Sequence, residues 1–140
     1  NNITIRIREN LGQMKLQLKI PQKTDKALHI NKEYEKKVNR VLQHISKEEI
    51  YELSGLHCSN DVKLLGSLKT IRCICNTFPN VKIALDKSFY FNNIDYEIEI
   101  EYVDELSIDI VDRLKMLDLH LDKDVNGKNK RFLSAYKKYN

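Results

Sequence analysis

The sequence has few of the features that indicate membrane, secreted or zinc-binding proteins. No apolar run approaches the roughly 20 residues needed to cross a bilayer, and the first residues show no signal-peptide pattern. We therefore expect a cytoplasmic protein without a membrane partner. The three cysteines, Cys58, Cys73 and Cys75, do not have the spacing of a zinc site, so we expect reduced, structural thiols.

The glycines and histidines are too scattered along the sequence to form a glycine-rich phosphate-binding loop or a histidine metal site. The four glycines do not make a phosphate-binding loop, which sets aside P-loop and dinucleotide-binding mechanisms. The four histidines show no spacing of paired metal ligands, and we expect them on the surface or on helix faces. Only His29, close to a predicted acidic strand, is a minor candidate for proton transfer.

The charge balance is mild. The 24 basic and 20 acidic residues give a net charge of +4, without the basic cluster and interleaved aromatics typical of a nucleic-acid partner. A chain of 140 residues with no repeat or linker can bury one core, so residues 1–140 are predicted to form a single domain. Because strand-like alternation begins at Asn1 without an initiating methionine, we expect a native N-terminal piece to be missing.

Alternation of apolar and polar residues predicts strands that pair mostly with their neighbours. The predicted strands cover residues 3–8, 14–20, 28–34, 62–65, 68–74, 81–85 and 95–102. Helical spacing predicts helices over 36–45, 46–53, 105–119 and 129–139. Ser46 and Glu49 form a capping box for the second helix, and Gly55 closes it.

These elements predict an α+β fold in which an antiparallel sheet closes toward a barrel. The apolar strand faces are expected to pack under helices, which turns the charged faces inward. The cationic residues on these faces are Arg6, Arg8, Lys15, Lys19 and Arg72, and the anionic ones are Glu33, Glu35, Glu97, Glu99 and Glu101.

Two interpretations of the charged faces remain open at this point. Glu97, Glu99 and Glu101 follow one another at every second position, about 7 Å apart, and repel one another unless cations neutralise them. A solvated outer face with Lys and Arg across the ladder is one explanation. The other is an interior in which arginines bind phosphate oxygens and carboxylates hold Mg²⁺ or Mn²⁺.

Five blocks of sequence favour the second interpretation. In order, they are residues 5–8 (IRIR), 16–21 (LQLKIP), 83–87 (IALDK), 95–101 (DYEIEIE) and 128–132 (KNKRF). Their order and spacing resemble the CYTH superfamily, the adenylate cyclase and thiamine triphosphatase-like triphosphate tunnel metalloenzymes, particularly the small Gram-positive bacterial members. The resemblance implies an eight-stranded antiparallel β-barrel, or tunnel, with flanking helices. The family's N-terminal E-x-E-x-K strand is absent from this chain.

The resemblance also implies roles for individual residues. The residues expected to bind phosphate are Arg6, Arg8, Lys19, Arg72, Lys128 and Arg131. Glu97 and Glu99 match an acidic pair assigned to metal binding or to the attacking water, and Glu33 and Glu35 resemble a second metal-binding pair. Asp86 fits a metal ligand and a counter-ion of Lys or Arg equally well, and Lys69 and Glu101 receive no role.

A metal-dependent hydrolase of triphosphate compounds, with Mg²⁺ or Mn²⁺ as cofactor, is the function that the resemblance implies. A class IV-type adenylate cyclase with the same fold, or a polyphosphate-binding module without activity, are the alternatives. The expected partner is a small-molecule triphosphate or polyphosphate, with no nucleic acid, and a homodimer is a further expectation.

Overall fold

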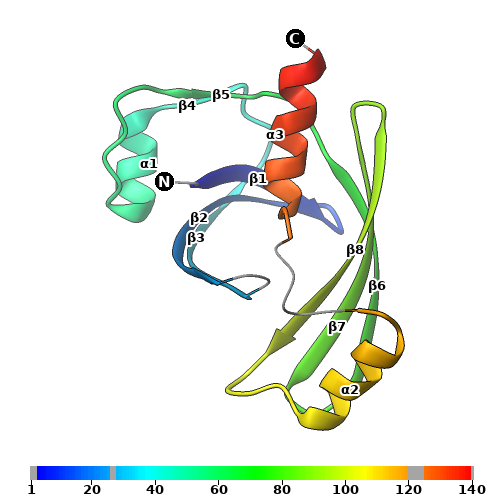
Figure 1. The fold of residues 1–140 in the computed structure, drawn as a ribbon. Coiled ribbons are helices and arrows are strands. Elements are labelled where there is room, and N and C mark those ends of the chain that lie inside the picture. Colours follow the sequence, from blue (N-terminus) through cyan, green and yellow to red (C-terminus); the bar gives the residue numbers. More distant parts are fainter. Residues whose placement is uncertain (1–2, 26–27, 120–124, 140) are drawn as a thin grey trace. The chain divides into compact units, whose positions relative to one another are not determined.

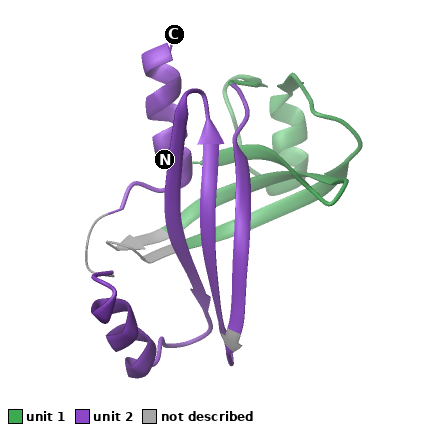
Figure 2. Cartoon of the chain, turned by 90° about the vertical axis from the view of Figure 1, so that its right-hand side faces the viewer, with its two compact units in different colours: residues 1–65 green, residues 66–140 purple. Residues whose placement is uncertain are grey.

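The structure is a computed structural model that describes residues 3–25, 28–119 and 125–139. The chain divides into two compact units, residues 1–65 and 66–140 (Figure 2). Each unit contains its own three-stranded antiparallel sheet, and unit 1 has an additional pair of short strands. Strands and helices together confirm the α+β class (Figure 1). No closed barrel is found among the described residues, so the eight-stranded barrel is not confirmed.

The described residues of unit 1 form five strands and one helix. The main sheet has the order β1-β2-β3, and the short strands β4 and β5 form a separate pair. The bounds are β1 (Thr4–Asn10), β2 (Gln13–Asp25), β3 (Leu28–Val38), β4 (His44–Ile45), α1 (Lys47–Ser54) and β5 (Val62–Lys63). Alternation along β2 sends Leu16 and Leu18 to one face, where both are completely buried with Ile45 and Ile50. The opposite face of this sheet therefore carries the charged residues.

The cap of α1 agrees with the prediction from the sequence. The Ser46 hydroxyl oxygen accepts a hydrogen bond from the backbone N–H of Glu49 at 3.1 Å. Gly55 closes the helix in the left-handed region, with φ of 71°, and its N–H donates to the Tyr51 carbonyl. These two ends fix the length of the helix that packs Ile50 into the core.

The helix predicted over residues 36–45 is wrong. Strand β3 continues to Val38, which pairs with Met14 of β2, and the chain then runs without helix to β4. Val38, Leu42 and Ile45 nevertheless all belong to the core of unit 1. A short apolar pattern of this kind does not distinguish a helix from an extended chain that reaches the same core.

In unit 2, residues 66–119 and 125–139 form one sheet, of order β6-β7-β8, and two helices. The bounds are β6 (Lys69–Phe78), β7 (Val81–Tyr90), β8 (Asn93–Tyr102), α2 (Ile108–Met116) and α3 (Lys128–Tyr139). The aromatic residues Tyr90 and Phe91 lie at the end of β7: Tyr90 is buried, and the Phe91 ring lies 5.1 Å from the ring of Phe132 in α3. These contacts attach α3 to the sheet.

The expectation that helices cover the apolar strand faces holds for unit 1 and is wrong for unit 2. In unit 2 the apolar side of the sheet is exposed, whereas Asp86 and Ser88 on the charged side are fully buried. The reason is that α3 presents Lys128 and Arg131 to the carboxylates of the sheet. None of the helices in the described part of the chain is long and apolar enough to span a membrane.

Candidate functional site

A row of charged residues crosses the sheet of unit 2. The strand register places Asp86 of β7 between Arg72 of β6 and Glu97 of β8. Two residues further along β8, Glu99 lies opposite Ala84 of β7, which has a small side chain. Because all these residues share one parity along their strands, their side chains project from the same face.

Asp86 is the buried centre of this row. Its Oδ1 accepts a hydrogen bond from Arg72 Nε at 2.7 Å, and its Oδ2 accepts from Arg72 Nη2 at 2.6 Å and from Lys128 Nζ at 2.5 Å. Burial acts to raise the pKa of Asp86, but the bonds from Arg72 and Lys128 outweigh it and hold that pKa below its usual range. Asp86 is therefore an ionised carboxylate held between two cations.

Glu97 and Glu99 share the ammonium group of Lys128. Its Nζ lies 2.9 Å from Glu97 Oε1 and 3.1 Å from Glu99 Oε1. Arg72 forms a further ion pair with Glu99. Burial acts to raise the pKa of Glu99, but a hydrogen bond with Glu97 and the positive charges of Lys128 and Arg72 lower it. Glu99 is consequently held as a carboxylate, close to Glu97.

The first turn of α3 supplies the cations. Lys128 and Arg131 are three positions apart and so share a helix face. Arg131 donates from Nε to Asp95 at 2.8 Å and forms an ion pair with Glu97. Burial acts to lower the pKa of each cation, but the carboxylate partners raise both values. The cations therefore stay protonated inside the site.

Asp95 and Tyr90 are members of this site that the sequence did not identify. The Tyr90 hydroxyl donates to Asp95, and this bond, with the Arg131 contact, lowers the pKa of Asp95. Asp95 shares its parity with Glu97 and Glu99, which is the signal that could have included it in the acidic row.

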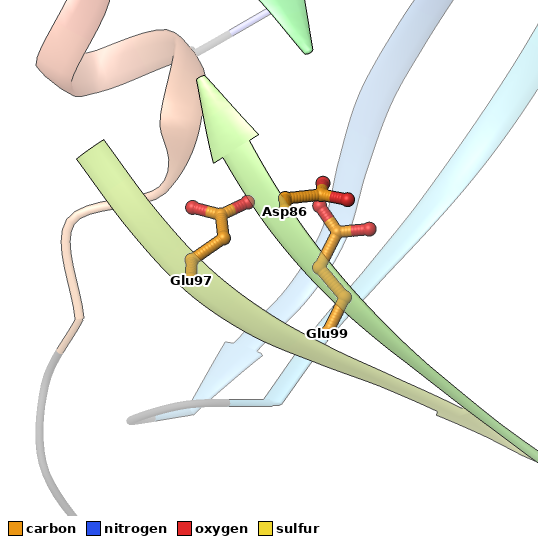
Figure 3. A group of neighbouring side chains, drawn as sticks. All are labelled: Asp86, Glu97 and Glu99. Atoms are coloured by element: carbon orange, nitrogen blue, oxygen red, sulfur yellow. The ribbon is translucent and has the colours of Figure 1, made fainter. Parts of the chain in front are cut away.

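The carboxylate oxygens of Asp86, Glu97 and Glu99 form a group that could bind a divalent metal. One oxygen of each lies within 4.8 Å of the others, and Figure 3 shows the three side chains meeting from β7 and β8. Carboxylate oxygens are the ligands that Mg²⁺ and Mn²⁺ prefer, so the chemistry of the donors fits these ions. Arg72 and Lys128 already contact the same carboxylates, so a metal would share them with these cations.

The other predicted site residues lie on the charged face of the sheet in unit 1. Arg6 donates from Nε to Gln17 Oε1 at 3.0 Å, and Gln17 in turn donates to Glu35 at 2.9 Å. Gln17 is buried, and it is the residue that links the arginine to the glutamate. The hydrogen bond from Lys15 is the main cause of a lowered pKa of Glu35. This network aligns Arg6 with the β2 and β3 side chains.

The remaining predicted residues of unit 1 are arranged around this network. Lys19 Nζ donates to Glu33 Oε1 at 2.5 Å, and Arg8 is exposed near the end of β1. Glu33 and Glu35 thus have lysine partners, and their assignment as metal ligands stays a prediction. The side chain of His29 lies outside the described part of the structure.

The structure thus groups the predicted residues into two sets, one in each unit. Arg72, Glu97, Glu99, Lys128 and Arg131 come together in unit 2. Arg6, Arg8, Lys19, Glu33 and Glu35 share a face in unit 1, as their positions in the strand register require. Each set combines cations suited to phosphate with carboxylates.

Comparison with known proteins identifies a family for most of the chain. A comparison with curated proteins and one with solved structures gave no match. The family model of the CYTH domain matches residues 1–124. Proteins with this domain are commonly enzymes that act on triphosphates and depend on divalent metals. Because the match extends over most of the sequence, the chain belongs to the CYTH domain family.

Proposed function

We propose that this chain is a divalent-metal-dependent hydrolase of triphosphate compounds, with Mg²⁺ or Mn²⁺ as the cofactor. The observation that supports it most directly is the interleaving of cations and carboxylates in unit 2. Three carboxylates lie within 4.8 Å of one another, and Lys128 Nζ is within 3.1 Å of each. A polyanion that arrives with a divalent cation is the kind of ligand that uses both charge types together.

The cations of the site are suited to hold phosphate. Arg72 and Arg131 offer planar guanidinium groups that bind two oxygens at once, and Lys128 adds a point charge. Their contacts with carboxylates keep these side chains oriented toward the site before substrate arrives. Such preorganisation reduces the cost of positioning the phosphates.

The carboxylates supply the remaining chemistry. Glu97 and Glu99 would hold the metal, with Asp86 beside them as the counter-ion of Arg72 and Lys128, and a bound Mg²⁺ or Mn²⁺ would neutralise charge that develops on the transferred phosphoryl group. Glu97 and Glu99, beside Lys128, are suited to orient a water molecule for attack on the terminal phosphorus and to accept its proton. The attack breaks the terminal phosphoanhydride bond and releases phosphate.

Arg6, Arg8 and Lys19 of unit 1 are part of the same proposal as further phosphate ligands. The proposal also keeps the eight-stranded barrel inferred from the resemblance, with residues 1–140 as most of one domain. Glu33 and Glu35 remain proposed as a second metal-binding pair. Their lysine partners Lys19 and Lys15 would then have to exchange partners when metal and phosphate bind.

Incubation of the full-length protein with tripolyphosphate and Mn²⁺ tests the proposal. We expect release of inorganic phosphate that stops when the metal is chelated. Binding of tripolyphosphate without release would indicate a polyphosphate-binding module. Formation of cyclic AMP from ATP, without phosphate release, would indicate a cyclase.

Arg6→Ala and Arg8→Ala are each expected to weaken tripolyphosphate binding about 10- to 100-fold. The loss of one charge-assisted contact costs roughly 1.5–3 kcal/mol, and each 1.4 kcal/mol is about tenfold in affinity. Both side chains project from the face opposite the core residues Ile5 and Ile7, so the chain should stay folded. Calorimetric titration measures the affinity.

Two controls accompany this measurement. Arg40→Ala removes an exposed arginine from the loop after β3 and should leave the affinity unchanged. Ile5→Ala should instead lower the free energy of unfolding by roughly 2–5 kcal/mol, because it opens a cavity beside the core. Unchanged affinity in both Arg6→Ala and Arg8→Ala would remove these residues from the phosphate site.

A further inference from the structure

The face of the β6-β7-β8 sheet opposite the carboxylates is apolar and exposed. We call it the outer face of unit 2. Large side chains on all three strands are between 38% and 67% exposed: Ile71, Leu85, Ile94, Tyr96, Ile98 and Tyr102. The strand register places Leu85 beside Ile98, and the other members lie in the rows around this pair. The exposed side chains thus form one contiguous surface.

The size of the outer face suggests an interface. At about 200 Å² for each side chain of this size, the six residues expose on the order of 600 Å² of mostly apolar surface. This equals the largest apolar patches of ordinary monomers, and it approaches the roughly 800 Å² that each partner contributes to a standard interface. Cys73 and Cys75 lie on the same face and are also exposed, which enlarges the patch.

Of the helices described in unit 2, α2 contacts this face at one end, where the Arg113 guanidinium lies 6.0 Å from the centroid of the Phe78 ring, and α3 lies on the other side of the sheet. Lys128 and Arg131 tie α3 to the carboxylate side of the sheet. In Figure 2 the sheet is seen without a helix of unit 2 in front of it. Burying such a surface against a partner is favourable by roughly 25 cal/mol per Å².

The charge distribution on the outer face indicates which partner fits. Its positions on the three strands include no carboxylate, and the two cations, Lys69 and Lys87, both lie toward one end. Lys87 Nζ lies 5.3 Å and 5.4 Å from the ring centroids of Phe89 and Tyr96, which partly satisfies its charge. The opposite end of the face, at Ile83 and Ile100, is apolar.

We propose that the outer face is the interface of a homodimer in which two copies stack their β6-β7-β8 sheets. A twofold axis near Leu85 brings the apolar centres together and places the two lysine ends at opposite edges, so that like charges do not meet. Two sheets that pack in this way lie about 10 Å apart with strands nearly aligned. Asp86, Glu97 and Glu99 face away from this interface, so each copy keeps its own site.

The oligomeric state of the full chain under reducing conditions tests this proposal. Sedimentation velocity is expected to show a dimer that dissociates on dilution. Ile98→Lys places a charge in the centre of the face and should raise the dimer dissociation constant at least about 100-fold. Met116→Lys is the matched control, because Met116 is 86% exposed on α2 and lies outside the face. It should dimerise like the unmodified protein.

Alkylation of the cysteines gives a second measurement that does not depend on a variant folding. Cys73 and Cys75 should react at least about tenfold more slowly at dimeric concentrations than after dilution, because only unpaired copies expose them. Cys58 in unit 1 serves as the internal reference. A chain that stays monomeric up to about 100 μM, with rapidly alkylated Cys73 and Cys75, would overturn the proposal. Slow alkylation of Cys73 and Cys75 that requires a different protein would also overturn the proposal. Neither measurement depends on the proposed hydrolase activity.

Discussion

Glu97→Gln and Glu99→Gln are each expected to reduce phosphate release from tripolyphosphate by about 1000-fold while the chain stays folded. Each change removes a proposed metal ligand or a group that orients the attacking water. Stabilisation by a metal ion is worth several kcal/mol in the transition state, and each 1.36 kcal/mol is about tenfold in rate. Phosphate release and Mn²⁺ affinity, measured on the same protein, check both roles.

The expected stability of these variants follows from the charge balance of the site. Four carboxylates, Asp86, Asp95, Glu97 and Glu99, face the three cations Arg72, Lys128 and Arg131. Neutralising one glutamate leaves three charges of each sign, so the lost ion pair is offset by relief of carboxylate repulsion. The free energy of unfolding without metal should therefore change little.

Glu101→Gln is the matched control for both variants. Glu101 lies on the same face of β8, but its side chain is 60% exposed, and its Oε2 lies 3.1 Å from Lys82 Nζ near the strand end. A surface pair of this kind contributes about 0–1 kcal/mol, and Mn²⁺ affinity should not change. Equal, near-zero effects at Glu97, Glu99 and Glu101 would contradict the metal assignment and leave a basic polyphosphate-binding surface.

The alternation of residues along β8 was enough to predict that Glu97, Glu99 and Glu101 share a face. Strand geometry places every second side chain on the same side, so this conclusion needs no tertiary information. The block 128–132 likewise placed Lys128 and Arg131 in the site through its resemblance to the family, and both contact Glu97. These parts of the site depend on local sequence.

The pairing of individual charges could not be predicted in this way. Alternation gives the face of a residue but not the register between strands, and register decides that Asp86 lies between Arg72 and Glu97. The docking of α3 on the charged side depends on ring contacts of Phe91 and on ion pairs between distant positions. Burial of Gln17 and Asp86 also results from tertiary packing, and nothing in their own sequence neighbourhood indicates it.

Asp86 fits either a metal ligand or a counter-ion of Lys and Arg, and a variant can separate these two interpretations. Both of its carboxylate oxygens accept hydrogen bonds from Arg72 or Lys128. Asp86→Asn is expected to lower the free energy of unfolding by about 3 kcal/mol, since it removes the charge that neutralises Arg72 and Lys128 in a buried position. The amide group would also turn hydrogen-bond donors toward these cations. Urea unfolding measures the change.

Ser88→Ala is the matched control, because Ser88 is buried on the same face of β7 and makes one hydroxyl contact, 3.1 Å from Thr70 Oγ1. It should cost about 1 kcal/mol. Mn²⁺ affinity should fall less in Asp86→Asn than in Glu99→Gln, since Asp86 acts mainly as the counter-ion that positions Arg72 and Lys128. If Mn²⁺ affinity instead falls as far as in Glu99→Gln while stability is unchanged, Asp86 is a metal ligand. Arg72 and Lys128 must then leave it when the metal binds.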